Sequence, residues 1–435
     1  MFPAPLLRLA IALPAAALVF SAGSSRAAGS VTTISKDATG AYTLIYNGKP
    51  FFIKGAGGGH NLEMLLKYGG NSIRTWGIDS LEEPVDGKPL IKRAAELGLT
   101  VCVGIWIKAE RQGVSYSDEA FLKAQREEVR AAVRKYKDEP ALLIWGLGNE
   151  MEGLTGPGND PRIWKELNTL AGIVKEEDPN HPVMTVIAGA APTKVKAALD
   201  YYPNIDILGV NAYAGASGAG SAVKNAGWTK PFILTEFGPV GQWEVPKTPW
   251  GAPIEPSSRD KAATYYSTQK LVRDKGEGLC LGSYCFLWGQ KQETTSTWYG
   301  MFLKTGEKLP TVDAMTFAWT GKWPENRSPK IETFDSPLRE ATIAPGTETT
   351  AKVVAKDAND DPLKIEWEVV AESTDIKTGG DKESEPPAIP DTIVSQKDGD
   401  VTIRTPAKPG AYRLFVTVLD GKGGASKDNF PFLVK

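Results

Sequence analysis

Eight short apolar runs, spaced between residues 50 and 290, constrain the fold of this 435-residue chain more than any other feature. They are rich in β-branched residues, mostly continuous rather than alternating, and bounded by turn residues, which is typical of parallel strands covered on both faces. Amphipathic stretches such as "DEAFLKAQREEVRAAVRKY" lie between them and predict helices. Eight strand–helix units in about 250 residues predict a (β/α)8 TIM barrel. The runs begin at Phe51, Asn71, Thr100, Ala141, Pro182, Asp206, Pro231 and Cys280.

A doubly wound open sheet is the alternative for such an alternation. It usually has fewer strands and a phosphate loop of the order G-x-G-x-x-G after the first one. The corresponding segment, Gly55 to His60, reads "GAGGGH" and lacks the last glycine. We therefore predict a close-packing loop at this place and favour the barrel.

The first residues of the chain have the pattern of a secretory signal peptide. Arg8 is followed by an apolar stretch from Leu9 to Phe20 and by the small-x-small site Ser25-Arg-Ala27. An uncleaved anchor is the alternative, although the apolar stretch is short for a bilayer. Taking residues 1–28 as a signal peptide, we expect an exported protein, periplasmic or extracellular, that has no contact with a membrane after cleavage.

The remaining chain divides into a barrel domain, residues 29–322, and a C-terminal domain, residues 333–435. The hairpin signal Asn47-Gly48 before the first strand predicts a β-hairpin at the barrel bottom. A segment with proline and charged residues, 323–332, predicts a linker. Alternating patterns such as "LKIEWEVV" and "AYRLFVTVLD" then predict an all-β, immunoglobulin-like sandwich.

The C-terminal domain offers few candidate binding residues. Asp357, Asp360 and Asp361 could hold a calcium ion, but a solvated turn is the favoured interpretation. Trp367 lies within a strand-like alternation and is expected in the core. A spacer or stabilising role is favoured over polysaccharide binding.

Composition excludes several classes of partner. The net charge of −2 and the pI of about 6.0 give no reason to expect nucleic acid. The two histidines, His60 and His181, show no metal-ligand spacing, so we predict neither a metal nor a cofactor. Three cysteines cannot form a disulfide framework, so we expect buried free thiols, although one disulfide between two of them stays possible. The cysteines are Cys102, Cys280 and Cys285. We expect the protein to be a monomer.

Two carboxylates stand at the ends of predicted strands. Glu150 closes the fourth run, "ALLIWGLGNE", and Glu236 lies in the seventh, "PFILTEFG". Reacting groups of parallel barrels gather at this end of the strands, and an unpaired carboxylate is costly to bury away from a cavity. A carboxylate pair in one cleft is what glycoside hydrolysis requires. The other side chains at strand ends are Arg74, Asn149, Asn211, Tyr213 and Trp288.

The segments "LIYNGKPFFIKGAG", "NSIRTWG", "WGLGNE" and "LTEFG" carry a family resemblance. Over roughly residues 40–320 the chain resembles the retaining β-glycosidases of clan A. It is most similar to the catalytic barrel of glycoside hydrolase family 2, and is related to family 5 and to β-1,3-glucanosyltransferases. In family 2 a sandwich and an immunoglobulin-like domain normally precede the barrel, whereas a β domain follows it in this chain.

The resemblance implies a role for each matching residue. Glu150 would be the general acid/base and Glu236 the nucleophile, with carboxyl groups about 5–5.5 Å apart. Asn149 would bind the sugar 2-hydroxyl, Arg74 would hold Glu236 ionised, and Tyr213 would donate to the nucleophile.

Aromatic residues complete the predicted substrate site. Trp288 would floor the subsite that holds the cleaved sugar, and Asn211 and Trp298 belong to the same predicted set of substrate-binding residues. Further stacking candidates, each equally well explained by core packing, are Trp76, Trp106, Trp243 and Tyr299.

We therefore expect a secreted retaining glycoside hydrolase that cleaves β-linked bonds of a poly- or oligosaccharide by double displacement. Transglycosylation by the same residues is one alternative, because acceptor choice depends on loop shape. A non-catalytic carbohydrate-binding or adhesion protein is another. The aromatic, proline-rich segment 238–258 after the seventh strand is the best candidate for setting specificity, and exo and endo action both stay open.

Overall fold

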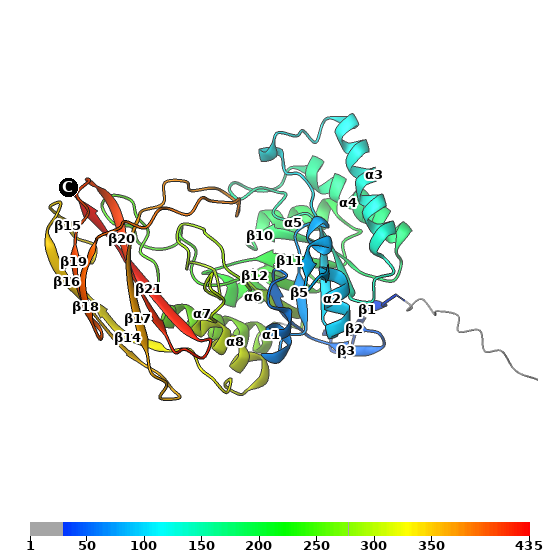
Figure 1. Ribbon diagram of the computed structural model, residues 1–435. Helices are drawn as coiled ribbons and strands as arrows, with labels where there is room; N and C mark the ends of the chain where they lie inside the picture. Colours follow the sequence, from blue (N-terminus) through cyan, green and yellow to red (C-terminus); the bar gives the residue numbers. More distant parts are fainter. Residues whose placement is uncertain (1–28, 277) are drawn as a thin grey trace, which may run out of the picture.

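The computed structural model describes residues 29–276 and 278–435, which form a barrel and a β-sandwich placed side by side (Figure 1). The predicted signal peptide lies outside these residues. Eight strands, all paired in parallel, close the barrel, and each corresponds to one predicted run, so the TIM barrel is confirmed. In chain order they are β4 (Ile53–Gly57), β5 (Ser72–Arg74), β8 (Thr100–Ile105), β9 (Leu142–Leu147), β10 (Val183–Ala188), β11 (Ile207–Asn211), β12 (Phe232–Phe237) and β13 (Cys280–Cys285).

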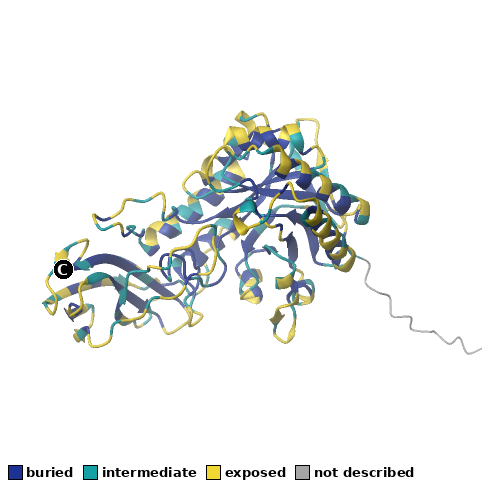
Figure 2. Cartoon of the chain, turned by 90° about the horizontal axis from the view of Figure 1, so that it is seen from above, coloured by how far each residue is buried: buried dark blue, intermediate teal, exposed yellow. Residues whose placement is uncertain are grey.

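Helices follow the strands and cover the barrel, with their inner faces buried and their outer faces exposed (Figure 2). Three of the longest begin where a side chain accepts hydrogen bonds from free backbone N–H groups: Asp118, Asp160 and Ser257. The helices are α1 (Leu62–Lys67), α2 (Leu90–Leu97), α3 (Glu119–Tyr136), α4 (Pro161–Glu177), α5 (Pro192–Tyr201), α6 (Ala219–Asn225), α7 (Ser258–Asp274) and α8 (Pro310–Thr320).

Short elements occupy the connections. A small antiparallel ribbon joins β5 to α2, and three single 3₁₀ turns lie in connecting loops. The ribbon is β6 (Pro84–Val85) with β7 (Lys88–Pro89), and the turns are Asp79–Glu82, Glu110–Gln112 and Ala216–Gly218.

The bottom of the barrel is closed by an N-terminal sheet of β1 (Thr32–Lys36), β2 (Tyr42–Tyr46) and β3 (Lys49–Phe51). Asn47 and Gly48 both adopt positive φ, 47° and 76°, as the predicted hairpin turn requires. Leu44 of this sheet is fully buried in one cluster with residues at the starts of the barrel strands. The N-terminal ends of the strands are therefore sealed, which leaves the C-terminal ends for a binding site.

Glycine in the first strand serves close packing, as predicted. A Cβ on Gly55 of β4 would overlap the ring of Tyr284 in β13, whose hydroxyl shares a 2.9 Å hydrogen bond with Ser72 of β5, on the other side of β4. The three cysteines are free, which settles the bridge that the sequence left open.

The C-terminal domain consists of two four-stranded sheets that enclose one core. Trp367 belongs to this core and contacts Phe334, as predicted. Asp357 accepts backbone N–H groups within the expected turn. One sheet has the order β14 (Lys330–Asp335), β16 (Glu348–Lys356), β19 (Asp400–Arg404), β18 (Ile393–Lys397), and the other β15 (Thr342–Ile343), β21 (Ala425–Val434), β20 (Gly410–Leu419), β17 (Lys364–Ala371). The immunoglobulin-like topology and the exact domain boundaries stay predictions.

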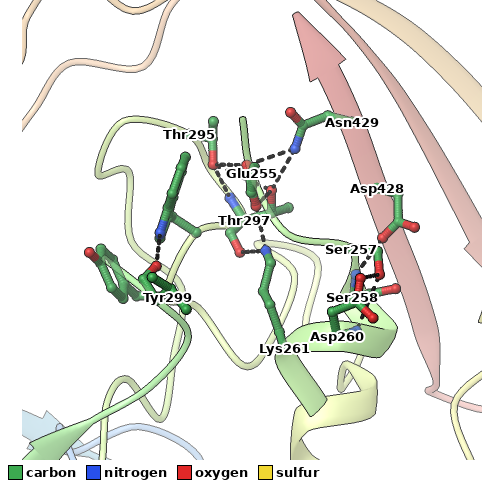
Figure 3. Close-up of polar contacts among 12 residues, drawn as sticks. Glu255, Ser257, Ser258, Asp260, Lys261, Thr295, Thr297, Tyr299, Asp428 and Asn429 are labelled. Carbon is green, nitrogen blue, oxygen red and sulfur yellow. Dashed lines mark hydrogen bonds and ion pairs between the residues drawn. The ribbon is translucent and has the colours of Figure 1, made fainter. Parts of the chain in front are cut away.

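A buried polar cluster joins the two domains (Figure 3). The carboxylate of Glu255, in the loop before α7, pairs with Lys261 and accepts hydrogen bonds from Thr295 (2.6 Å), Thr297 (2.8 Å) and Asn429 of β21 (2.7 Å). Burial raises the pKa of Glu255, but the opposing charges and hydrogen bonds outweigh it and hold the pKa below its ordinary value. The cluster thus fixes the sandwich against the loop that follows β13.

We expect Glu255→Ala to lower the free energy of unfolding by about 3–5 kcal/mol, because it leaves the buried Lys261 ammonium unpaired. Guanidinium unfolding at pH 7 measures the effect. Because the pKa of Glu255 is lower in the folded state, its contribution to the free energy of unfolding is complete above the pKa that the carboxyl has in the unfolded chain. This contribution is lost as the pH falls through the folded-state pKa. Glu348→Ala, which breaks an exposed pair with Arg404, is the control and should cost less than about 1 kcal/mol. Equal losses in the two variants would contradict the role of the cluster.

Candidate active site

Glu150 and Glu236 lie at the C-terminal end of the barrel, on the two strands that the sequence indicated. After β9, Gly148 and Glu150 both take positive φ, 70° and 55°, and the backbone N–H of Glu150 donates to Val186 at 2.8 Å. Positive φ is uncommon for a residue with a side chain and is held by its surroundings. Gly148 would not accept a Cβ, since Met151 fills that space. The tight turn presents Glu150 at the barrel mouth.

Three donors hold the carboxylate of Glu236. Oε1 accepts from Arg74 Nη1 and from Trp76 Nε1, both at 2.8 Å, and Oε2 accepts from the Tyr213 hydroxyl at 3.0 Å. Arg74 is only 2% exposed, so its charge acts on Glu236 with little screening by water. The carboxylate is therefore fixed in one orientation with its negative charge balanced.

Glu150 has the opposite character. Shielding from water and the nearby charge of Glu236 raise the pKa of the Glu150 carboxyl to about 7, and a hydrogen bond from Asn211 Nδ2 (3.0 Å) opposes the rise. A carboxyl of this kind keeps its proton close to neutral pH. The two carboxyl groups of one site thus have different surroundings, and Glu150 is the one suited to donate a proton.

A hydrogen-bond chain connects the two carboxylates. Asn149 Oδ1 accepts from Arg74 Nη2 (2.7 Å) and Asn211 Nδ2 (3.1 Å), and Asn211 Oδ1 accepts from Thr235 Oγ1 (2.8 Å). With Oδ1 used twice, Asn149 keeps its amide donors for a ligand. Arg74 and Asn211, 2% and 3% exposed, position these groups from below, whereas the sequence grouped both with the substrate-binding residues.

Two predicted aromatic contacts are wrong. Trp288 and Trp298 are both 0% exposed, so neither can stack on a sugar. Trp288 packs on Phe302 and Trp319 in the barrel core, and its Nε1 donates to Asn61 O.

Trp298 is covered by the long loop 238–258, to which its Nε1 donates at Val240 O (3.0 Å). Its burial supports this loop from beneath, and nothing of the indole face remains for a ligand.

Phe286, directly after β13, takes the place beside the carboxylates. Its ring meets Trp76, Tyr213 and Tyr299 edge to face, with centroids 5.8, 6.3 and 5.6 Å apart. Such pairs are the favoured aromatic geometry. Phe286 is therefore the aromatic residue after the last strand that packs against two of the donors to Glu236.

Some stacking candidates remain open to solvent. Trp243, in the loop 238–258, is 58% exposed and meets the Tyr213 ring edge to face at 5.6 Å. Trp106, after β8, is 39% exposed. Both can face a carbohydrate at the rim.

Sequence reasoning missed three contributions. Trp76 was a stacking candidate, but it donates directly to Glu236; its position two residues after Arg74, on the same face of an extended segment, was the available signal. Phe286 was passed over for a tryptophan. Glu152 forms a buried pair with Lys194 (3.0 Å) behind Glu150 and adds to the rise of its pKa.

Within residues 29–276 and 278–435, no three His, Cys, Asp or Glu residues are grouped so that they could hold a metal ion. Among the helices of that same part of the chain, none combines the length and apolar character that crossing a bilayer requires.

A barrel whose mouth holds two carboxyl groups in different surroundings fits the arrangement that glycoside hydrolysis requires. The family comparison agrees: residues 95–241 match the family described as "Glycosyl hydrolases family 2, TIM barrel domain". This confirms, over residues 95–241, the resemblance to the catalytic barrel of glycoside hydrolase family 2. No curated protein sequence matches the chain.

Two solved structures are similar to this chain at low identity, and the first of them shares its fold. A Bacteroides uniformis β-glucuronidase 2, covalently bound to cyclophellitol-6-carboxylate aziridine, is similar with a TM-score of 0.51 and 13% identity, over 93% of this chain and 48% of that one. A family 2 β-galacturonidase from Eisenbergiella tayi, bound to galacturonate, gives a TM-score of 0.49 and 16% identity over 67% of this chain and 54% of that one. The chain thus spans about half the length of these proteins.

Proposed function

We propose that this protein is a retaining glycoside hydrolase that cleaves β-linked glycosidic bonds by double displacement. The observation that carries the proposal is the unequal carboxylate pair: Glu150, with a pKa of about 7, beside Glu236, held by three donors. We also propose that the signal-like residues 1–28 direct export and that the partner is a β-linked poly- or oligosaccharide.

In the first step Glu150 gives its proton to the leaving oxygen while Glu236 attacks the anomeric carbon. The glycosidic bond breaks and a covalent glycosyl-enzyme forms, with inversion at that carbon. Glu150, now a carboxylate, takes a proton from water. The water oxygen attacks the same carbon with a second inversion, while the bond to Glu236 breaks and releases its carboxylate. The sugar leaves with its original β configuration, and Glu150 is protonated again.

The surrounding residues supply binding that strengthens in the transition state. The free amide donors of Asn149 are placed for the sugar 2-hydroxyl, a contact that strengthens as charge develops on the ring. Phe286, 7% exposed, would border the sugar ring with the part of its ring that stays open, in place of the expected Trp288. Trp243, 58% exposed, would extend the binding surface.

A time course on β-linked glucans, mannans, galactans and xylans tests the proposal. Products that shorten with time and retain the β configuration support hydrolysis, and products longer than the substrate indicate transfer instead. No release from any substrate, in wild type as in a Glu236→Ala variant, would contradict an enzyme and favour the binding-protein alternative.

The pH profile should report on Glu150. Because the acid must be protonated, kcat/KM should fall about tenfold per pH unit above the pKa of about 7. The rate is measured with a substrate whose aryl leaving group needs little protonation and with one whose leaving group is a sugar. Only the second should show the alkaline loss, and Glu150→Gln should remove that limb. An unchanged limb in this variant would mean that another group titrates.

A further inference from the structure

The loop between β17 and β18, residues 372–392, reaches from the sandwich to the barrel, and we name it the strap. In Figure 1 it is the orange-brown loop that leaves the sandwich and runs toward the barrel. Its base is tied to its own sheet, since Ile389 N donates to Val369 O at 2.8 Å. Its far end makes contacts with loops of the other domain.

The tip of the strap touches barrel loops from opposite sides of the mouth. Gly379 lies against Arg111, after β8, and Leu154, after β9: a Cβ on Gly379 would be 2.8 Å from Arg111 Nη2 and 3.3 Å from Leu154 Cδ1. The carbonyl of Gly380 accepts from Lys291 Nζ, after β13, at 2.8 Å. Strands β4 and β5 separate β13 from β8 in the barrel, so the tip bridges the mouth between these loops.

A buried carboxylate anchors the strap. Glu383 is 4% exposed and accepts the backbone N–H groups of Thr294 (2.6 Å) and Lys377 (3.1 Å). Thr294 has φ 64°, a conformation that a β-branched residue rarely adopts without such support. Asp381 adds a charge 3.7 Å from Arg111. These contacts dock the strap on the barrel.

The bridge is close to the reacting groups. Lys291, which holds Gly380, also pairs with Glu293 at 2.7 Å, and its ammonium lies 5.5 Å from the centre of the Phe286 ring. Phe286 in turn packs on Trp76, the donor to Glu236. Lys291 therefore links the strap to the aromatic ring that lies next to the donors of Glu236.

We propose that the strap is a specificity element that blocks one end of the cleft, so that short β-linked oligosaccharides or chain ends are accepted and long internal segments are rejected. This inference rests on the proposed function. The physical reason is steric: a polysaccharide that crosses the barrel mouth needs open space on both sides of the reacting groups. The bridge from Lys291 to Arg111 runs over the side of β4 and β5.

The test shortens the tip in the full chain. Replacing residues 378–382 by two glycines removes Gly379, Gly380 and their contacts but keeps Glu383 and the fold of the strap base. We expect kcat/KM on β-linked disaccharides to stay within threefold of wild type, and kcat/KM on the polymer of the same linkage to rise at least tenfold. Products should shift from single sugars to mixed oligosaccharides.

Two further variants sharpen the result. Arg111→Ala removes one anchor of the tip and should shift the polymer-to-disaccharide ratio in the same direction. Combined with the shortened tip it should add nothing, since it acts through the tip. Glu385→Gln, in the same strap but paired with the exposed Lys304, is the matched control and should leave the ratio unchanged.

A folded shortened variant with the wild-type ratio would overturn the inference. A binding measurement distinguishes a wrong inference about the strap from a wrong proposal of hydrolytic activity. If wild type hydrolyses none of the panel, tryptophan fluorescence titrations with β-linked oligosaccharides of two and eight units still decide. A tenfold gain in affinity of the shortened variant for the longer chain supports the strap, and equal affinities overturn it.

Discussion

Glu236→Ala is expected to lower kcat/KM by about 10⁴-fold or more, which corresponds to about 5 kcal/mol of lost transition-state stabilisation. The variant removes the atom that would bond to the anomeric carbon, and no other described carboxylate is held at the mouth by Arg74, Trp76 and Tyr213 together. Initial rates on an aryl β-glycoside and on a β-linked disaccharide measure the loss. Both substrates should lose activity, since both need the first displacement.

The stereochemistry of rescue makes this prediction specific. Sodium azide fits the space that the side chain leaves and can attack the anomeric carbon once, so the product should be the α-glycosyl azide. Tyr213→Phe is the graded control: it removes one donor to Glu236, keeps the ring that packs on Phe286, and should cost far less. Residual activity within tenfold of wild type in Glu236→Ala would exclude this residue as the nucleophile.

The barrel and its two carboxylates were predictable for the same physical reason. Continuous apolar runs predict strands buried on both faces. When such parallel strands close into a barrel, the C-terminal ends of all of them lie at the same mouth. Glu150 and Glu236 could be placed there from the positions of their runs alone. Arg74, Asn149 and Asn211 follow from the same rule, but the buried positions of Arg74 and Asn211 beneath the other polar groups do not.

Contacts between distant segments explain what could not be predicted. Trp288 is buried because Trp319 of α8 packs on it, and Trp298 because the loop 238–258 covers it. A residue type at a strand end cannot reveal either contact. The strap is the strongest case: Lys291 and Gly380 are 89 positions apart, in different domains, and turn composition alone marks the strap only as a loop.

The loss of activity in Glu150→Gln should depend on the leaving group of the substrate. For a sugar leaving group we expect kcat/KM to fall about 10²–10⁴-fold, the usual contribution of a general acid. For a dinitrophenyl leaving group, which departs without a proton, the first step should be nearly unchanged. Glutamine keeps an oxygen that accepts from Asn211, so the turn after β9 should keep its geometry. Steady-state rates on a disaccharide and on the dinitrophenyl β-glycoside measure the division.

The second step, hydrolysis of the glycosyl-enzyme, gives an independent test of Glu150. Without a general base, water attacks the glycosyl-enzyme slowly. The dinitrophenyl substrate should therefore release a burst of dinitrophenol, followed by a slow steady-state rate. Azide needs no base and attacks the face that Glu236 does not occupy, so it should restore turnover and give the β-glycosyl azide. The opposite anomers from the two variants would assign the two carboxylates to opposite faces of one sugar ring. An α product, or equal losses on both substrates, would contradict the role of Glu150, because only a group that serves as acid and then as base predicts both effects.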